Sequence, residues 1–127
     1  MQRDMELIRK ILFAIEKEYV DVRLDYNDLK IEEYAFKTVG YHCSILCDAG
    51  LVYDYKSHYS ENELDYFEVG SLTWEGHEFL DKIRNETVWN KTKEIIANDG
   101  LPFVIDVVKK VASEITTTMI KAAIGCI

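Results

Sequence analysis

The sequence predicts a mostly helical α+β fold with one small β-hairpin, and three observations lead to this class. Apolar residues recur at three- and four-residue steps over most of the chain, as they do on the buried face of a helix. Two stretches, 51–56 and 64–69, are instead rich in aromatic and β-branched residues, which favour strands. The 127 residues are 48% hydrophobic and 30% charged with one proline, the composition of a compact globular chain.

The N-terminal half is predicted to contain three helices and a short strand. Apolar spacing predicts a helix over 3–18, and the alternation of apolar and charged residues that follows predicts a half-buried strand over 20–25. Further helices are predicted over 29–36 and 37–49, the second of them ended by Gly50 in the position that glycine favours just past a helix.

The helix predicted over 37–49 has two distinct faces. Val39, Cys43, Leu46 and Cys47 lie on one stripe, which we expect to face the core. The opposite stripe, expected in solvent, consists of Lys37, Tyr41, Ser44 and Asp48.

The remainder of the chain is predicted to form a hairpin and three helices. The strands 51–56 and 64–69 are joined by the polar connector 57–63. Helices follow over 74–84, where Phe79, Leu80 and Ile83 form the buried stripe, and over 86–97. Asn98 to Gly100 ends the second of these, and Pro102 is expected in the first turn of a terminal helix. We expect residues 1–84 to form the core and 85–127 a helical extension of one compact domain.

The terminal helix carries a near-heptad apolar stripe. Such a stripe either docks on its own domain or pairs with the same helix of a second copy, giving a homodimer. The candidate self-association residues are Val104, Val108, Val111, Ile115 and Met119.

The predicted order of helix, short strand, helix, helix and hairpin is that of a winged helix, a helix-turn-helix variant in which a hairpin flanks the recognition helix. The segment Tyr41–Val52 resembles the recognition-helix end of bacterial winged-helix regulators, and Ser71–His77 resembles their hairpin-to-helix junction.

Five segments together resemble one uncharacterised family, the domain of unknown function twenty-five thirteen, over roughly residues 1–110. Leu72–Asp81, with the sequence LTWEGHEFLD, is the most specific of them, and the others are Arg3–Leu12, Tyr41–Leu51, Val88–Lys91 and Gly100–Pro102. The resemblance implies a small phage or prophage protein with a winged-helix-like core and no assigned biochemical activity.

The charge balance argues against a general nucleic-acid coat, because 15 Lys and Arg stand against 23 Asp and Glu, a formal net charge of −8. The hairpin region 54–68 is itself acidic, with Lys56 as its only Lys or Arg. A winged-helix DNA-binding regulator stays open as the alternative function. In that case we expect Lys37, Tyr41 and Ser44 to contact bases and Lys56 to contact a phosphate.

Protein binding is the function that the sequence favours over DNA binding. Tyrosines around an acidic hairpin suit a protein interface better than a phosphate backbone, although they could also simply pack the sheet on the core. The interface candidates are Tyr53, Tyr55, Tyr59, Tyr66, Glu61 and Glu63. A host factor or a defence complex would be the partner if the gene belongs to a phage.

We expect no enzymatic activity, metal or cofactor. Cys43 and Cys47 share a helix face but lack a second ligand pair, and His77-Glu78 begins a zincin motif that then has Asp81 in place of its second histidine. No phosphate-binding glycine loop occurs. An odd, sparse cysteine set, which includes Cys126, and a charged N-terminus predict a cytoplasmic protein with reduced thiols and no membrane segment. Both tryptophans, Trp74 and Trp89, are expected as core or interface anchors, with the core favoured.

Overall fold

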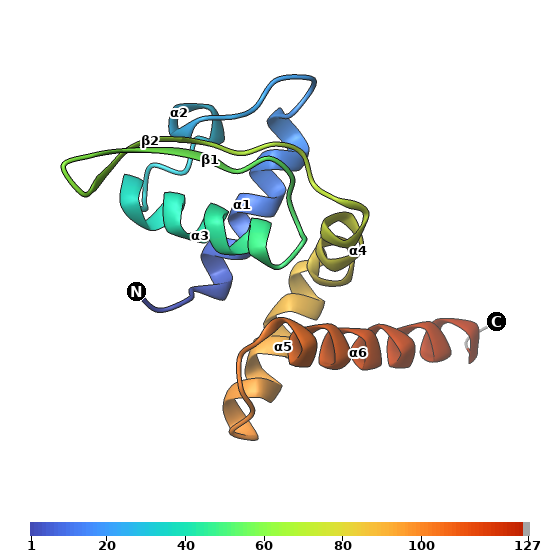
Figure 1. Cartoon of the computed structure of the whole chain (residues 1–127). Coiled ribbons are helices and arrows are strands. Elements are labelled where there is room, and N and C mark those ends of the chain that lie inside the picture. The colour runs from blue at the N-terminus through green and yellow to red at the C-terminus, as the bar shows by residue number, and fades with distance from the viewer. Residues whose placement is uncertain (126–127) are drawn as a thin grey trace. The chain divides into compact units, whose positions relative to one another are not determined.

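Most of residues 1–125, the part of the chain that the computed structural model describes, is helical, which confirms the α+β, mostly helical class. The elements in this part are α1 (Met5–Glu18), α2 (Tyr26–Leu29), α3 (Phe36–Asp48), β1 (Lys56–Ser60), β2 (Glu63–Glu68), α4 (Trp74–Ile83), α5 (Glu86–Asn98) and α6 (Ile105–Gly125) (Figure 1). The chain divides into two compact units, Met1–Glu78 and Phe79–Ile127, with the boundary inside α4. No helix within residues 1–125 is long and apolar enough to cross a bilayer.

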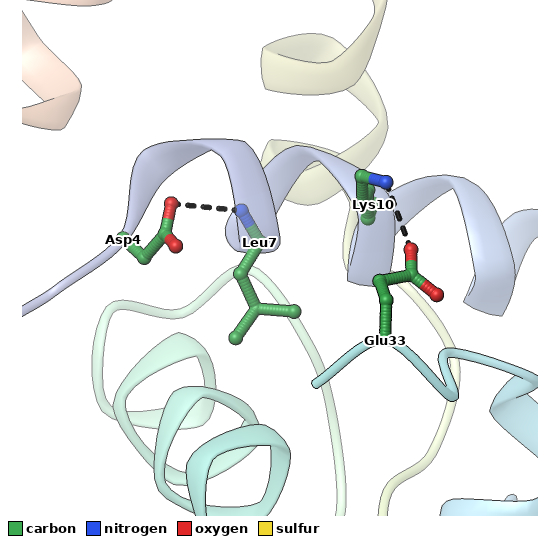
Figure 2. Close-up of polar contacts among 4 residues, drawn as sticks. All are labelled: Asp4, Leu7, Lys10 and Glu33. Carbon is green, nitrogen blue, oxygen red and sulfur yellow. Dashed lines mark hydrogen bonds and ion pairs between the residues drawn. The ribbon is translucent and has the colours of Figure 1, made fainter. Parts of the chain in front are cut away.

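Helix α1 begins at a strong cap. The Asp4 side chain accepts hydrogen bonds from the backbone N–H groups of Glu6 and Leu7, at 3.0 and 3.2 Å, which satisfies two of the four donors that a helix start leaves free. Figure 2 shows the bond from Leu7 to Asp4 and, further along α1, the ion pair of Lys10 with Glu33 in the loop before α3. The distance from Lys10 Nζ to Glu33 Oε1 is 2.8 Å. The buried face of α1 consists of Met5, Leu7, Ile8, Ile11, Leu12 and Ile15.

A buried histidine joins α1 to α3. His42 is fully buried, and its Nε2 lies 2.8 Å from the Asp4 backbone nitrogen, while its Nδ1 lies 2.8 Å from the Thr38 carbonyl oxygen. Because the Asp4 amide can only donate, Nε2 must accept and Nδ1 must carry the proton that bonds Thr38. The neutral imidazole therefore has one tautomer that satisfies both contacts.

The predicted strand over 20–25 is wrong except at one residue. Val20 and Val22 are 82% and 69% exposed, and only Leu24 pairs, through two backbone bonds with Val69. The alternating pattern is real, but a strand needs a neighbour along its length, and here only Val69 provides one.

The second helix also lies elsewhere than predicted, since α2 spans Tyr26–Leu29 rather than 29–36. Asp25 and Asp28 form a reciprocal capping box that starts the helix, and Lys30, with a left-handed backbone at φ 57°, ends it. In contrast, α3 lies within one residue of its predicted range, and Gly50 follows it with φ +76°.

The hairpin is shifted along the chain from its predicted position. Most of the predicted polar connector 57–63 belongs to the strands, which turn at Glu61 and Asn62 with φ of 52° and 69°. Two consecutive positive φ values are typical of the tight turn that matches strand twist. The segment around Val52 instead pairs with Leu72 outside the hairpin.

The junction between α3 and α4 explains the most specific sequence motif. Thr73 Oγ donates to the Gly50 carbonyl at 2.6 Å and accepts from the Gly76 N–H at 3.0 Å, so one hydroxyl links the end of α3 to the start of α4. Gly76 lies so close to the Leu51 carbonyl oxygen that no Cβ fits. Threonine and glycine in LTWEG are therefore structural residues.

In the second unit, α5 begins at Asn85, whose side chain accepts from the Val88 N–H at 3.0 Å, and packs against α6. Trp89 is buried as predicted, with its ring centroid 5.9 Å from that of Phe103.

The prediction for Pro102 is wrong, because α6 begins only at Ile105. Gly100 follows α5 with φ +65°, and residues 101–104 connect α5 to α6. Beyond Ile115, α6 is exposed as it extends away from α5 (Figure 1).

We expect Gly76→Ala to lower the free energy of unfolding by about 1–3 kcal/mol, because the added methyl must displace the Leu51 backbone. Urea denaturation followed by circular dichroism measures the loss. Gly125→Ala at the end of α6, where the methyl meets open space, is the control and should be nearly neutral. Equal effects of the two substitutions would contradict the close approach.

Burial raises the pKa of the Cys43 thiol above its ordinary value. Above pH about 8.5 the unfolded chain releases this proton while the folded chain retains it, so stability that is fully present below that pH is lost as pH rises, by up to about 1.4 kcal/mol per pH unit. We expect Cys43→Ala to flatten this decline in urea denaturation series at pH about 8.5 to 9.5. Val39→Ala, a core truncation that removes no titratable group, should leave the slope unchanged. Identical slopes in both variants would refute the assignment.

Candidate binding groove

A groove of about 360 Å³ lies between α3 and the hairpin, within the first unit. It brings together residues that the sequence analysis had assigned to two competing functions. Three of the four DNA candidates and three of the six protein-interface candidates line the same concavity. The lining residues are Met1, Lys37, Tyr41, Ser44, Tyr55, Tyr59, Asn62, Glu63 and Leu64.

Helix α3 supplies one wall because its two faces differ as predicted. Val39, Cys43 and Leu46 are buried, while Cys47, predicted on the same stripe, is half-buried. Lys37 and Tyr41 are exposed and Ser44 is half-buried. Since residues three and four positions apart share a helix face, the packing of the first set turns the second set toward the groove.

The hairpin supplies the other wall because it approaches α3 at a glycine. A Cβ on Gly40 would lie 2.6 Å from Leu64 Cδ2 and 3.0 Å from Phe67 Cδ1, so only glycine permits this contact without a shift. Leu64 and Phe67 are three residues apart and could not both face α3 from a regular strand. The extra residue in β2, Asp65, makes this possible, because His58 pairs with Tyr66 while Tyr59 pairs with Leu64.

Aromatic packing holds the base of the groove. The fully buried Phe67 ring lies 5.4 Å from that of Phe36 and 6.2 Å from that of Tyr55, nearly parallel to the latter at 24°. Burial raises the pKa of the Tyr55 hydroxyl, an effect that its hydrogen bond with Ser57 opposes. At neutral pH this groove tyrosine is therefore a neutral hydrogen-bonding group and not a phenolate.

The charges near the groove are largely paired. Lys37 Nζ lies 3.5 Å from Glu63 Oε2 across the groove. On the outer face of the hairpin, Asp65 accepts from Ser60 Oγ at 3.1 Å and lies 3.2 Å from His58 Nδ1. Glu68 is 3.3 Å from Arg23 Nε and lies opposite Lys56 in the sheet. Both lysines proposed for DNA contact thus have a carboxylate beside them.

The remaining hairpin candidates lie outside the groove. Lys56 and Glu61 are exposed but do not line it, so the four DNA candidates are not gathered at one place. Tyr53 and Tyr66 are 53% and 44% exposed and also lie outside it. Burial, together with Glu68, raises the pKa of the Tyr66 hydroxyl, which stays protonated at neutral pH.

The self-association candidates on α6 differ in accessibility. Val108 is fully buried, Val104, Val111 and Ile115 are half-buried, and Met119 is 42% exposed. Ile120 and Ile124, at 52% and 64% exposed, extend the accessible apolar surface toward the end of the helix.

The core assignment of Trp74 is wrong, because this side chain is 73% exposed. Its neighbours Thr73 and Gly76 turn inward to join α4 to α3 and Leu51, which leaves Trp74 on the opposite side of the first turn. Within the LTWEG motif the buried residues are Leu72, Thr73 and Gly76, while Trp74 and Glu75 are exposed.

No group of three or more metal-ligating side chains occurs within residues 1–125. Cys43 and Cys47 are free thiols, and Cys126 lies outside the described residues. Every buried side-chain nitrogen or oxygen in the described part of the chain has a hydrogen-bond partner. The groove is thus the feature of this part of the chain that is best suited to recognition, with hydroxyl, aromatic and charged groups on a concave surface.

The fold and the site define a small α+β protein with a tyrosine-lined groove. Comparison with known proteins identifies its family. The family described as "Hypothetical protein (DUF2513)" matches residues 2–102, and the chain belongs to this family. The chain is 38% identical over 122 residues to an "Uncharacterized protein" of Haemophilus influenzae, covering 94% of this chain and 99% of the relative. No solved structure matches this chain. The family predicted from the LTWEGHEFLD segment and its companions is therefore confirmed.

Proposed function

We propose that this chain is a non-enzymatic protein-binding module that holds a partner in the groove between α3 and the hairpin. The single observation that carries the proposal is the lining, in which three tyrosines surround a Lys37–Glu63 pair on a concave surface. The scaffold is, in this proposal, an acidic winged helix whose recognition helix is α3 and whose wing is the hairpin.

The tyrosines support protein recognition for a physical reason. A tyrosine offers a large apolar ring and a hydroxyl at the entropic cost of only two side-chain torsions, so it is a frequent anchor of protein interfaces. Tyr41 and Tyr59 are 38% and 59% exposed and can still bury area on binding, whereas Tyr55 is half-buried and forms the base.

The charge arrangement favours protein over DNA. A phosphate backbone is gripped by unpaired Lys and Arg, but Lys37 lies beside Glu63 and Lys56 lies opposite Glu68. The acidic groups of the hairpin would repel a duplex brought to the same face. DNA-binding regulation is the alternative function.

The cellular setting is part of the same proposal. Free Cys43 and Cys47 suit a reducing compartment, so we place the protein in the cytoplasm. The family resemblance implies a phage or prophage origin, in which case a host factor or a defence complex is the partner.

Self-association through α6 is a second proposal, supported by the exposed apolar side chains of Met119, Ile120 and Ile124 at a helix end. Val108 is buried and belongs to the packing of the chain itself, so the contact would use the exposed end of the helix.

We expect Tyr41→Ala combined with Tyr59→Ala to lose a partner that the wild-type chain captures from a bacterial lysate, identified by quantitative mass spectrometry. Tyr53→Ala, an exposed tyrosine outside the groove, is the matched control and should retain the partner. Fluorescence anisotropy with labelled duplex DNA, at low and physiological salt, should show no binding. Tight, steeply salt-dependent DNA binding that Lys37→Glu abolishes would establish the alternative function instead.

For self-association, we expect the wild-type chain to elute as a dimer in sizing chromatography and Met119→Asp to elute as a folded monomer, as judged by circular dichroism. The reason is that a buried, unpaired carboxylate strongly opposes contact between apolar surfaces. Thr118→Asp, an exposed residue of α6 on the side opposite Met119, Ile120 and Ile124, is the control and should remain dimeric. A monomeric wild type, or a dimeric Met119→Asp variant, would refute this proposal.

A further inference from the structure

The outer edge of β1 has no backbone partner within residues 1–125. The sheet has two strands, and β1 pairs with β2 alone. Two isolated bridges involve Leu24 with Val69 and Val52 with Leu72, and neither reaches Lys56–Ser60. All five residues of β1 are exposed. Such an edge can accept another extended chain.

The edge is also regular enough to pair. The one irregularity of the hairpin places its extra residue, Asp65, in β2, so β1 runs without an insertion from Lys56 to Ser60. Five residues in extended conformation offer the alternating donors and acceptors that an antiparallel or parallel neighbour needs.

The groove lies where the side chains of an added strand would point. Tyr59 in β1 and Tyr55 just before it line the groove from the sheet side, and Tyr41 lines it from α3. Side chains along a strand alternate between faces, so every second residue of a strand added to β1 would face these tyrosines.

The charge of the hairpin indicates which side chains fit. The region 54–68 carries Asp54, Glu61, Glu63, Asp65 and Glu68, against Lys56 and His58. Lys37 and Arg23 lie beside Glu63 and Glu68, and carboxylates remain in excess around the hairpin. Arginine or lysine on the incoming strand would gain attraction to these carboxylates, and a guanidinium also stacks on tyrosine rings. An acidic segment would meet repulsion at the same positions.

We propose that the groove takes an extended segment of the partner protein that carries arginine or lysine at alternate positions and adds as a strand to the outer edge of β1. This inference rests on the proposed function and names the chemistry of its partner. Main-chain hydrogen bonds to β1 supply part of the affinity, and the tyrosines and Glu63 select the side chains.

The first test uses the full chain and a labelled eight-residue peptide of alternating arginine and threonine, with fluorescence anisotropy at physiological salt. Two further versions carry N-methyl groups on one or the other set of alternate residues, which removes backbone donors from one edge without changing charge. We expect one of the two methylated versions to bind at least about tenfold more weakly than the unmethylated arginine–threonine peptide. A glutamate–threonine peptide should not bind. Equal binding of the three arginine peptides would overturn strand addition.

The second test locates the site. Glu63→Gln should weaken the arginine–threonine peptide about two- to fivefold and Tyr59→Ala about tenfold. Both side chains are exposed, so these variants should keep the fold. Glu94→Gln, which removes a carboxylate from α5, is the control for the overall negative charge and should bind normally. Equal losses in Glu63→Gln and Glu94→Gln, with no loss in Tyr59→Ala, would show binding to net charge alone and overturn the inference.

Amide hydrogen exchange gives an independent readout, because peptide addition should protect β1 amides more than those of α5. No protection in β1 at saturating peptide would also overturn the inference.

If the arginine peptide fails to bind while a captured partner still requires Tyr41 and Tyr59, strand addition is refuted and the proposed function stands. If peptide binding depends on Tyr59 but no captured partner depends on the groove tyrosines, the proposed function is the part refuted. If two copies of this chain instead pair through their β1 edges, and the N-methylated peptides dissociate this dimer, the occupant of the edge is a second copy. That outcome would refute a basic partner segment.

Discussion

The contact between His42 and the backbone of Asp4 sets the arrangement on which the first unit depends. A buried imidazole with no partner would cost much of the stability of a small domain, so its two 2.8 Å contacts restrict how α1 and α3 can pack. Asp4 caps α1 with its side chain and bonds His42 with its own amide, so one residue joins the start of α1 to the middle of α3. This pairing sets the rotation of α3 about its axis, and thereby selects Lys37, Tyr41 and Ser44 as its outward stripe.

The groove is a consequence of close backbone packing on both sides of α3. Gly40 lets Leu64 and Phe67 approach the helix, and the extra residue in β2 turns both side chains toward it. Gly76 and Thr73 then hold the segment after the hairpin against Leu51 and Gly50. The concavity arises because the hairpin contacts α3 near Gly40 and leaves Tyr41 and Tyr59 uncovered. The same contact stabilises the fold and shapes the binding surface.

Electrostatics gives this scaffold a character unlike that of a DNA reader. Of the two lysines considered for DNA contact, Lys37 lies 3.5 Å from Glu63, and Lys56 lies opposite Glu68 in the sheet. The tyrosine lining, the acidic hairpin and the unpaired edge of β1 within the described chain are three separate observations, and a basic extended segment would satisfy all of them at once. The proposed function rests on the groove and its lining residues.

Local signals were sufficient for α1, α3, α4 and α5, whose predicted bounds lie within two residues of the observed ones, because amphipathic spacing and caps such as Asp4 and Asn85 act within a few residues. Amphipathic spacing also selected Lys37, Tyr41 and Ser44 as an outward stripe, whereas the LTWEGHEFLD segment was a marker only through its resemblance to a known family. Local signals failed for the strand over 20–25, the hairpin limits and Trp74. Strand pairing and exposure depend on neighbours distant in the chain, such as Val69 for Leu24 and Leu51 for the turn that leaves Trp74 outside. The meeting of Tyr41 with Tyr59 in one groove was likewise decided by tertiary packing, because no local interaction encodes the approach of β2 to Gly40.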